Sequence, residues 1–215
     1  MKIHLADSEY WDVLGKDFQK LYIHELEVAY KEVAVLLPFG SPYLNFFVQP
    51  REYDLIDKTH DAGRTYNSEF IEMAFDPKYY AKQSNEVVRN HIRVTVYHEM
   101  NHAARFNLGI WHASFLDDCI LEGLATVFER DHIAPPLWAD YPKNVAVWLK
   151  EIEDNMDTLD RTQYLYTHDD GRRWIGYKVG TYLVDEAMKN SGKSIEELTK
   201  LECKDVLRMS KVVKV

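Results

Sequence analysis

The chain has 215 residues, of which 46% are hydrophobic and 28% are charged, and these values are typical of one globular domain with a sizeable core. They exclude a disordered chain, a collagen-like repeat and a disulfide-rich scaffold. The formal charge of −9 argues against binding to nucleic acid or to an anionic membrane. The longest apolar run, residues 33–39, is too short for a bilayer span, and residues 1–7 carry charges where a signal peptide needs an apolar stretch. We therefore expect a cytoplasmic protein, with Cys119 and Cys203 as buried free thiols.

The first third of the chain predicts one long helix followed by a small sheet. Residues 8–37 have apolar side chains at spacings of three and four, and a Pro- and Gly-containing segment at residues 38–42 ends this helix. Residues 43–49 and 69–75 are rich in the aromatic and β-branched side chains of strands, and a polar stretch around residues 61–64 separates them. We expect a small antiparallel sheet within about residues 1–80, with residues 69–75 as a candidate edge strand for an extended peptide.

The remainder of the chain predicts helices, at about residues 84–107, 115–130, 141–158 and 174–190, with short helices after them. Gly109 follows the first of these helices, and Ser114 with Asp117 three residues later can cap the second. No internal repeat or flexible linker divides the chain. We therefore expect a single α+β domain over residues 1–215, with a helical metal-binding part from about residue 84.

A His-Glu-x-x-His motif at residues 98–102 lies inside the first of these helices. His98 and His102 are one helical turn apart, about 6 Å along the axis, so both imidazoles can reach one cation such as zinc. Glu99 projects to the side of this pair, where it can take a proton from a zinc-bound water that attacks a carbonyl group. The motif predicts a catalytic zinc site with Glu99 as the general base.

A catalytic zinc site needs a third protein ligand, and Glu122 is the best candidate. This glutamate lies in an otherwise apolar helix, where a carboxylate is costly to bury unless it is paired or bound to metal. A structural ion pair at Glu122 is the competing interpretation, and His112 could replace it as ligand or line the cleft. The metzincin pattern is excluded, because Arg105 and Leu108 occupy the positions where that pattern requires Gly and His.

The motif at residues 98–102, the Glu-Gly-Leu-Ala segment at residues 122–125, the segment 174–180 and the ending 194–198 together resemble a little-characterised family of predicted zinc-dependent proteases of gluzincin type. The resemblance covers roughly residues 85–210. It implies a thermolysin-like, zincin-like layout, with an edge strand over the cleft, the metal-binding helix beneath it and a second helix that supplies Glu122. Gluzincins often have an Asp four residues after this Glu to orient a histidine; here Thr126 stands at that position, and Asp118 could serve instead.

Attack on an amide produces an oxyanion, which zinc usually shares with a Tyr, His or Arg side chain. Tyr177 and His168 are the candidates, and Tyr177 is preferred because Gly176 and Gly180 leave room for substrate or for close packing beside it. These features predict a monomeric zinc metallopeptidase with one Zn²⁺ per chain and a peptide or protein substrate.

Two other classes of protein remain open. Glu99 with His102 and Glu129 with His132 both have the Glu-x-x-His spacing of carboxylate-bridged di-iron bundles, although the predicted strands argue against such a bundle. Alternatively, the chain is a catalytically inactive binding module with a zincin fold.

Overall fold

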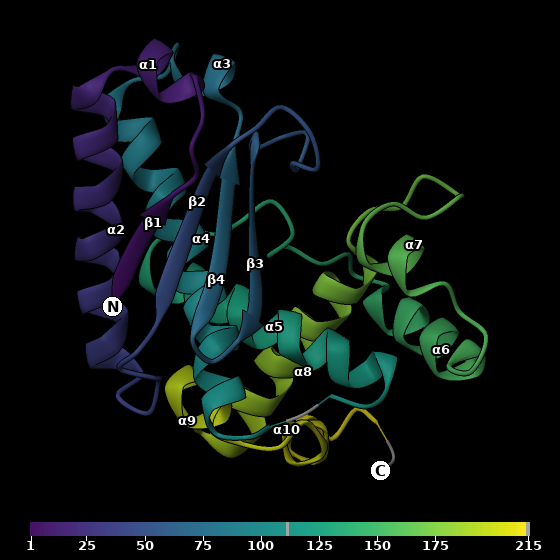
Figure 1. Cartoon of the computed structure of the whole chain (residues 1–215). Coiled ribbons are helices and arrows are strands. Elements are labelled where there is room, and N and C mark those ends of the chain that lie inside the picture. The colour runs from purple at the N-terminus through teal and green to yellow at the C-terminus, as the bar shows by residue number, and fades with distance from the viewer. Residues whose placement is uncertain (111, 214–215) are drawn as a thin grey trace. The chain divides into compact units, whose positions relative to one another are not determined.

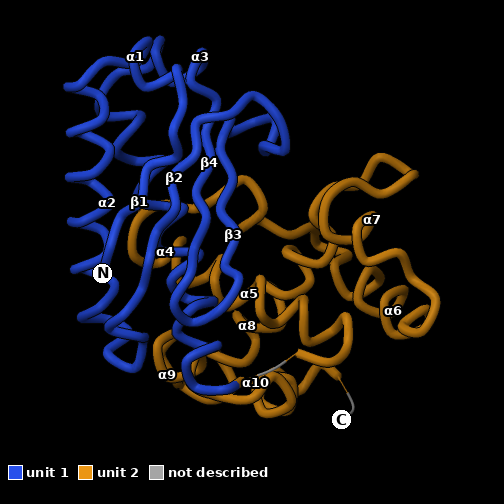
Figure 2. Tube along the Cα trace, viewed as in Figure 1, with its two compact units in different colours: residues 1–109 blue, residues 110–215 orange. Residues whose placement is uncertain are grey.

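The computed structural model describes residues 1–110 and 112–213, and the chain divides into two compact units (Figure 2). Unit 1 comprises Met1–Gly109 and contains a sheet with its helices, and unit 2 comprises Ile110–Val215 and is built from helices. The chain is therefore α+β, as the sequence predicts. The helix that carries the His-Glu-x-x-His motif belongs to unit 1 rather than to the helical unit, and the prediction of one domain over residues 1–215 stays a prediction.

The sheet of unit 1 has four strands in the order β1-β2-β4-β3: β1 (Lys2–Leu5), β2 (Asn45–Pro50), β3 (Asp61–Asn67) and β4 (Phe70–Phe75). The expected antiparallel sheet is wrong, because β1, β2 and β4 are parallel and only β3 runs antiparallel, beside β4. A long helix connects β1 to β2, and such a crossover returns the chain in the same direction. The expected edge strand is also wrong: β4 lies between β2 and β3, and the edge strands are β1 and β3.

The helices of unit 1 are α1 (Tyr10–Leu14), α2 (Lys16–Leu36), α3 (Pro77–Tyr80) and α4 (Asn85–Asn107). The single helix expected over residues 8–37 is broken at Gly15, whose φ of +82° leaves the helical region and suits glycine alone. In unit 1, α2 and α4 pack against each other, and α4 also packs on β3 and β4 (Figure 1). Tyr22 of α2 stacks on Phe75 of β4 with ring centroids 5.0 Å apart, which joins α2 to the same core.

The helices of unit 2 are α5 (Phe115–His132), α6 (Val145–Asn155), α7 (Arg161–Leu165), α8 (Ile175–Ser191), α9 (Ile195–Thr199) and α10 (Cys203–Ser210). The Ser114 side chain accepts a hydrogen bond from the Asp117 amide and the Asp117 side chain accepts from the Ser114 amide, which confirms the predicted capping box of α5. The helix expected at residues 141–158 is shorter, because it begins only after Pro142 and ends in a turn at residue 156.

Close backbone contact between α5 and α8 forms the core of unit 2. A Cβ atom on Gly180 would overlap the Cys119 carbonyl group, and a Cβ atom on Gly123 would overlap the backbone of Gly180. The sequence left two reasons for Gly180, room for substrate or close packing, and the structure supports close packing. Cys119 and Cys203 are both buried thiols, as predicted. None of the helices in the described residues combines the length and the apolar character that a membrane span requires.

Candidate metal centre

The two motif histidines lie in the buried central turns of α4. Ser84 caps this helix by accepting a hydrogen bond from the Val87 amide, and the helix then continues unbroken to Asn107. His98 and His102 are each 7% exposed, and their ring centroids are 4.8 Å apart with the planes nearly perpendicular. The helical spacing therefore brings the two imidazoles together, as the motif predicts.

Glu99 is buried on the side of α4 that faces strand β3. The residue is 6% exposed, and the Thr65 hydroxyl lies 2.7 Å from Glu99 Oε2 and 2.9 Å from the Glu99 carbonyl oxygen, both within hydrogen-bond distance. The carboxyl group also lies directly over Gly63, where an added Cβ atom would be only 2.5 Å from Oε1. Thr65 and Gly63 were not singled out from the sequence, because β3 is too polar to be recognised as a strand.

A second polar connection ties the first residue of β3 to α4. Asp61 is 8% exposed, and its Oδ2 accepts hydrogen bonds from the Tyr80 hydroxyl at 3.0 Å and from the Thr95 hydroxyl at 3.4 Å. The Tyr80 hydroxyl also lies 3.0 Å from Nδ1 of His91 on α4. Burial and the adjacent Asp61 carboxylate raise the pKa of Tyr80 well above its ordinary value, so its hydroxyl stays protonated as a donor. The strand and the helix are thus fixed to each other at Asp61 as well as at Thr65.

Glu122 lies on α5 in unit 2 and is half-buried. The residues that the structure describes include a group of three side chains that could hold a metal ion: His98, His102 and Glu122. Two imidazole nitrogens and one carboxylate oxygen are a donor set typical of catalytic zinc sites, so the chemistry of these residues fits zinc.

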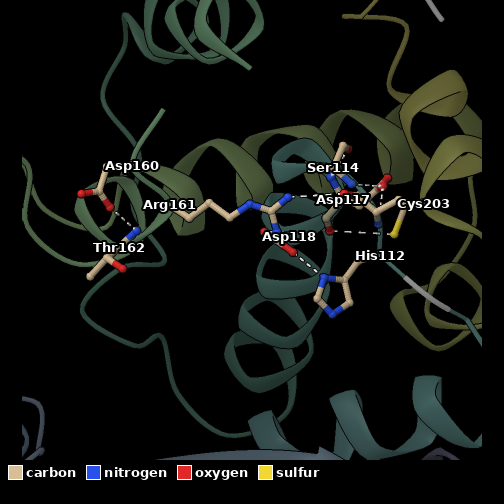
Figure 3. Close-up of polar contacts among 9 residues, drawn as sticks. His112, Ser114, Asp117, Asp118, Asp160, Arg161, Thr162 and Cys203 are labelled. Atoms are coloured by element: carbon tan, nitrogen blue, oxygen red, sulfur yellow. Dashed lines mark hydrogen bonds and ion pairs between the residues drawn. The ribbon is translucent and has the colours of Figure 1, made fainter. Parts of the chain in front are cut away.

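Asp118, one turn before Glu122, holds His112 and Arg161 (Figure 3). Its Oδ1 is 2.5 Å from His112 Nδ1, and its Oδ2 accepts a hydrogen bond of 2.9 Å from Arg161. The hydrogen bond to the Asp118 carboxylate raises the pKa of His112 above its ordinary value, and partial burial opposes the increase. Both Asp118 oxygens therefore have partners within unit 2, and Oδ1 orients His112 through the contact with Nδ1.

The two candidates for the oxyanion-stabilising residue lie in different surroundings within unit 2. Tyr177 is half-buried in the first turn of α8, and its ring centroid is 5.4 Å from that of Trp138. His168 lies in the connection before α8, where its Nδ1 is 3.1 Å from a carboxylate oxygen of Asp170. The side chain of His168 thus belongs to an ionic turn that also includes Arg172, whose guanidinium pairs with Asp170.

The second Glu-x-x-His pair lies at the end of α5. Glu129 is 3% exposed, and His132 Nε2 is 2.7 Å from a carboxylate oxygen of Glu196. Neither residue belongs to the group of described side chains that could hold a metal ion. His132 therefore has a hydrogen-bond partner on α9.

A comparison with protein families matches residues 51–208 to the family described as "Predicted Zn-dependent protease (DUF2268)". No curated protein and no solved structure matches the chain. The matched region contains α4 with its two histidines, β3 and α5 with Glu122. This region is well over half of the sequence, and it confirms the resemblance that the motifs indicate: the chain belongs to this family of predicted zinc-dependent proteases.

Proposed function

We propose that the chain is a zinc metallopeptidase of gluzincin type, which hydrolyses a peptide bond by attack of water. The observation that carries the proposal is the buried pair of His98 and His102 on α4, together with the buried carboxyl group of the next residue, Glu99, which Thr65 holds against β3. The family to which the chain belongs supports the same activity.

In this proposal His98, His102 and Glu122 hold one zinc ion. Each of these three residues offers one atom that can bind a metal ion, which supports their assignment as zinc ligands. Two neutral nitrogens and one carboxylate leave a position open for substrate or water, as catalytic zinc sites require. When bound, zinc supplies a Lewis acid that polarises a carbonyl group and lowers the pKa of water.

Glu99 is the general base of the proposed reaction. Its carboxylate accepts the proton of the attacking water and later delivers this proton to the leaving amine. Burial and the hydrogen bond from Thr65 keep the carboxylate in one orientation, which reduces the entropy lost when water is positioned.

Tyr177 donates a hydrogen bond to the oxyanion in this proposal, and His168 is the second candidate. Two observations favour Tyr177: it lies in the first turn of a long helix, and its ring rests against Trp138. His168 instead has a carboxylate partner in its own turn. The zincin-like layout is part of the proposal, with β3 rather than β4 as the edge strand beside the metal-binding helix.

The decisive variant is Glu99→Gln in the zinc-loaded chain. We expect the zinc content to remain at about one ion per chain, because the substitution changes no proposed ligand. Cleavage of an unstructured test protein should fall by about 100- to 10,000-fold, because the general base is lost. Metal analysis and a fluorogenic cleavage assay measure the two quantities.

Glu86→Gln is the matched control, since it makes the same chemical change in the exposed first turn of α4. Both quantities should equal those of the wild-type chain. Wild-type cleavage by Glu99→Gln would remove Glu99 from the mechanism. A wild-type chain that binds zinc without cleaving any peptide would favour the inactive binding module instead.

A further inference from the structure

The environment of the Glu99 carboxyl group differs between its two oxygens. Oε2 lies within hydrogen-bond distance, 2.7 Å, of the Thr65 hydroxyl, which also lies 2.9 Å from the carbonyl oxygen of the same residue. Oε1 accepts no hydrogen bond from the other residues of unit 1 and lies over Gly63. One oxygen is thus anchored to β3, and the lone pairs of the other are left for water.

The geometry of an edge strand explains how β3 supplies both features. Successive side chains of a strand point to opposite faces, so Asp61, Gly63 and Thr65 share one face. Asp61 and Thr65 bond to Thr95 and Glu99 of α4, which shows that this shared face is turned toward the helix. Gly63 lies between Asp61 and Thr65 on this face, and the Glu99 carboxyl group occupies the space that a side chain at residue 63 would fill.

We propose that Thr65 is a positioning residue that anchors Glu99 Oε2, so that Oε1 is the oxygen that accepts the proton from water. Gly63 helps to position the same carboxyl group, because any side chain at this position would displace it. This inference rests on the proposed peptidase function and goes beyond it by assigning separate tasks to the two oxygens of the base.

Replacement of Gly63 by alanine would move the carboxyl group by steric overlap. An added Cβ atom would lie 2.5 Å from Cγ and Oε1 of Glu99 and 2.7 Å from Cδ, far inside ordinary contact distance. Because the Glu99 side chain is confined between α4 and β3, it has to leave its anchored orientation. Gly63→Ala should therefore reproduce the kinetic effect of losing the Thr65 hydroxyl.

The first test is Thr65→Val, which removes the hydroxyl and nearly preserves the side-chain volume. A hydrogen bond to a charged group contributes about 1.5–3 kcal/mol. This range corresponds to a decrease in kcat on the order of tenfold to a hundredfold. KM and zinc content should stay within about twofold of wild type, because neither substrate nor metal touches Thr65 in this proposal. Thr65→Ser restores the hydroxyl and should restore most of kcat.

Thr95→Val is the matched control, because it removes another hydroxyl at the contact between α4 and β3 without touching Glu99. Its kcat should equal that of the wild-type chain. A Thr65→Val enzyme with wild-type kcat would overturn the positioning role, as would a Thr65→Ser enzyme that is no faster than Thr65→Val.

A second measurement needs neither metal nor turnover. In the metal-free chain, urea unfolding of wild type, Thr65→Val, Glu99→Ala and the double variant gives the coupling between the two side chains. We expect Thr65→Val to raise the unfolding equilibrium constant at least about fivefold more in the presence of Glu99 than in its absence, because the hydrogen bond to the carboxylate stabilises the folded state. Zero coupling would overturn the contact itself. Coupling in a wild-type chain without turnover would retain the contact but overturn the proposed peptidase and, with it, the catalytic task of Oε1.

Discussion

A single buried carboxylate, Asp118, raises the pKa of the histidine beside it. Its side chain is 9% exposed, and it lies between the imidazole of His112 and the guanidinium of Arg161. The guanidinium of Arg161 and the hydrogen bond with His112 compensate for the cost of burying the carboxylate. In return, the hydrogen bond to Asp118 raises the pKa of His112, so this histidine stays protonated to a higher pH than an ordinary one.

Asp118→Asn should lower the pKa of His112 toward the ordinary value of about 6.5, because a neutral amide no longer favours the imidazolium ion. In the wild-type chain the interaction stabilises the fold fully below the unfolded-state pKa, and this stability is lost as the pH rises through the raised folded-state pKa. Titration of the His112 ring protons by NMR measures the shift. Identical pKa values in the two proteins would show that Asp118 does not control this histidine.

At the scale of elements, two glycines determine how closely α5 and α8 approach. Gly123 and Gly180 lie where the backbones of the two helices touch, and Cys119 contributes its carbonyl group to the same contact. A helical glycine usually reduces stability by about 1 kcal/mol relative to alanine. Here the close approach reverses this preference, because a backbone atom cannot move aside as a flexible side chain can.

Gly180→Ala should destabilise the chain by about 3 kcal/mol, because the methyl group would overlap the backbone of α5. Gly40→Ala is the control, since the nearest atom to its added Cβ would be at an ordinary distance of 3.4 Å, and its effect should stay within about 0.5 kcal/mol. Urea denaturation measures both. A stabilised Gly180→Ala variant would mean that intrinsic helix preference outweighs the close contact.

The elements with strong local signals could be predicted from the sequence. The apolar periodicity and caps of α4, α5 and α8 placed these helices to within about two residues, and the His-Glu-x-x-His spacing placed both imidazoles on one helical face. Strands β1 and β3 were missed, because β1 has only four residues and β3 is polar and contains Gly63. The contact of Thr65 with Glu99 was missed for the same reason, since it joins residues 34 positions apart through an unrecognised strand.

At the scale of the whole molecule, the proposed ligands come from both halves of the sequence. His98 and His102 belong to residues 1–109, and Glu122 belongs to residues 110–215. A ligand that binds only the folded chain stabilises it by an amount that grows with concentration. Binding of one zinc ion to the folded chain would therefore stabilise it against unfolding.

Zinc at a free concentration of 100 times its Kd should stabilise the chain by about 2.7 kcal/mol. For a chain of this length, that corresponds to an increase in Tm of roughly 5–10 °C. Glu122→Ala should lose most of this increase at the same zinc concentration, because a proposed ligand is missing. Calorimetry with and without zinc measures the effect. An equal increase in Tm and equal zinc affinity in Glu122→Ala would assign the third ligand to another residue.

Both cysteines of the chain lie in residues 110–215, and both are buried. Burial raises the pKa of the Cys119 thiol well above its ordinary value, so the reactive thiolate is scarce while α5 and α8 stay packed. Alkylation of Cys119 therefore requires that this helix pair opens. Since residues 1–109 have no cysteine, a thiol reagent reports on the opening of unit 2 alone, and the native chain contains this probe without any labelling mutation.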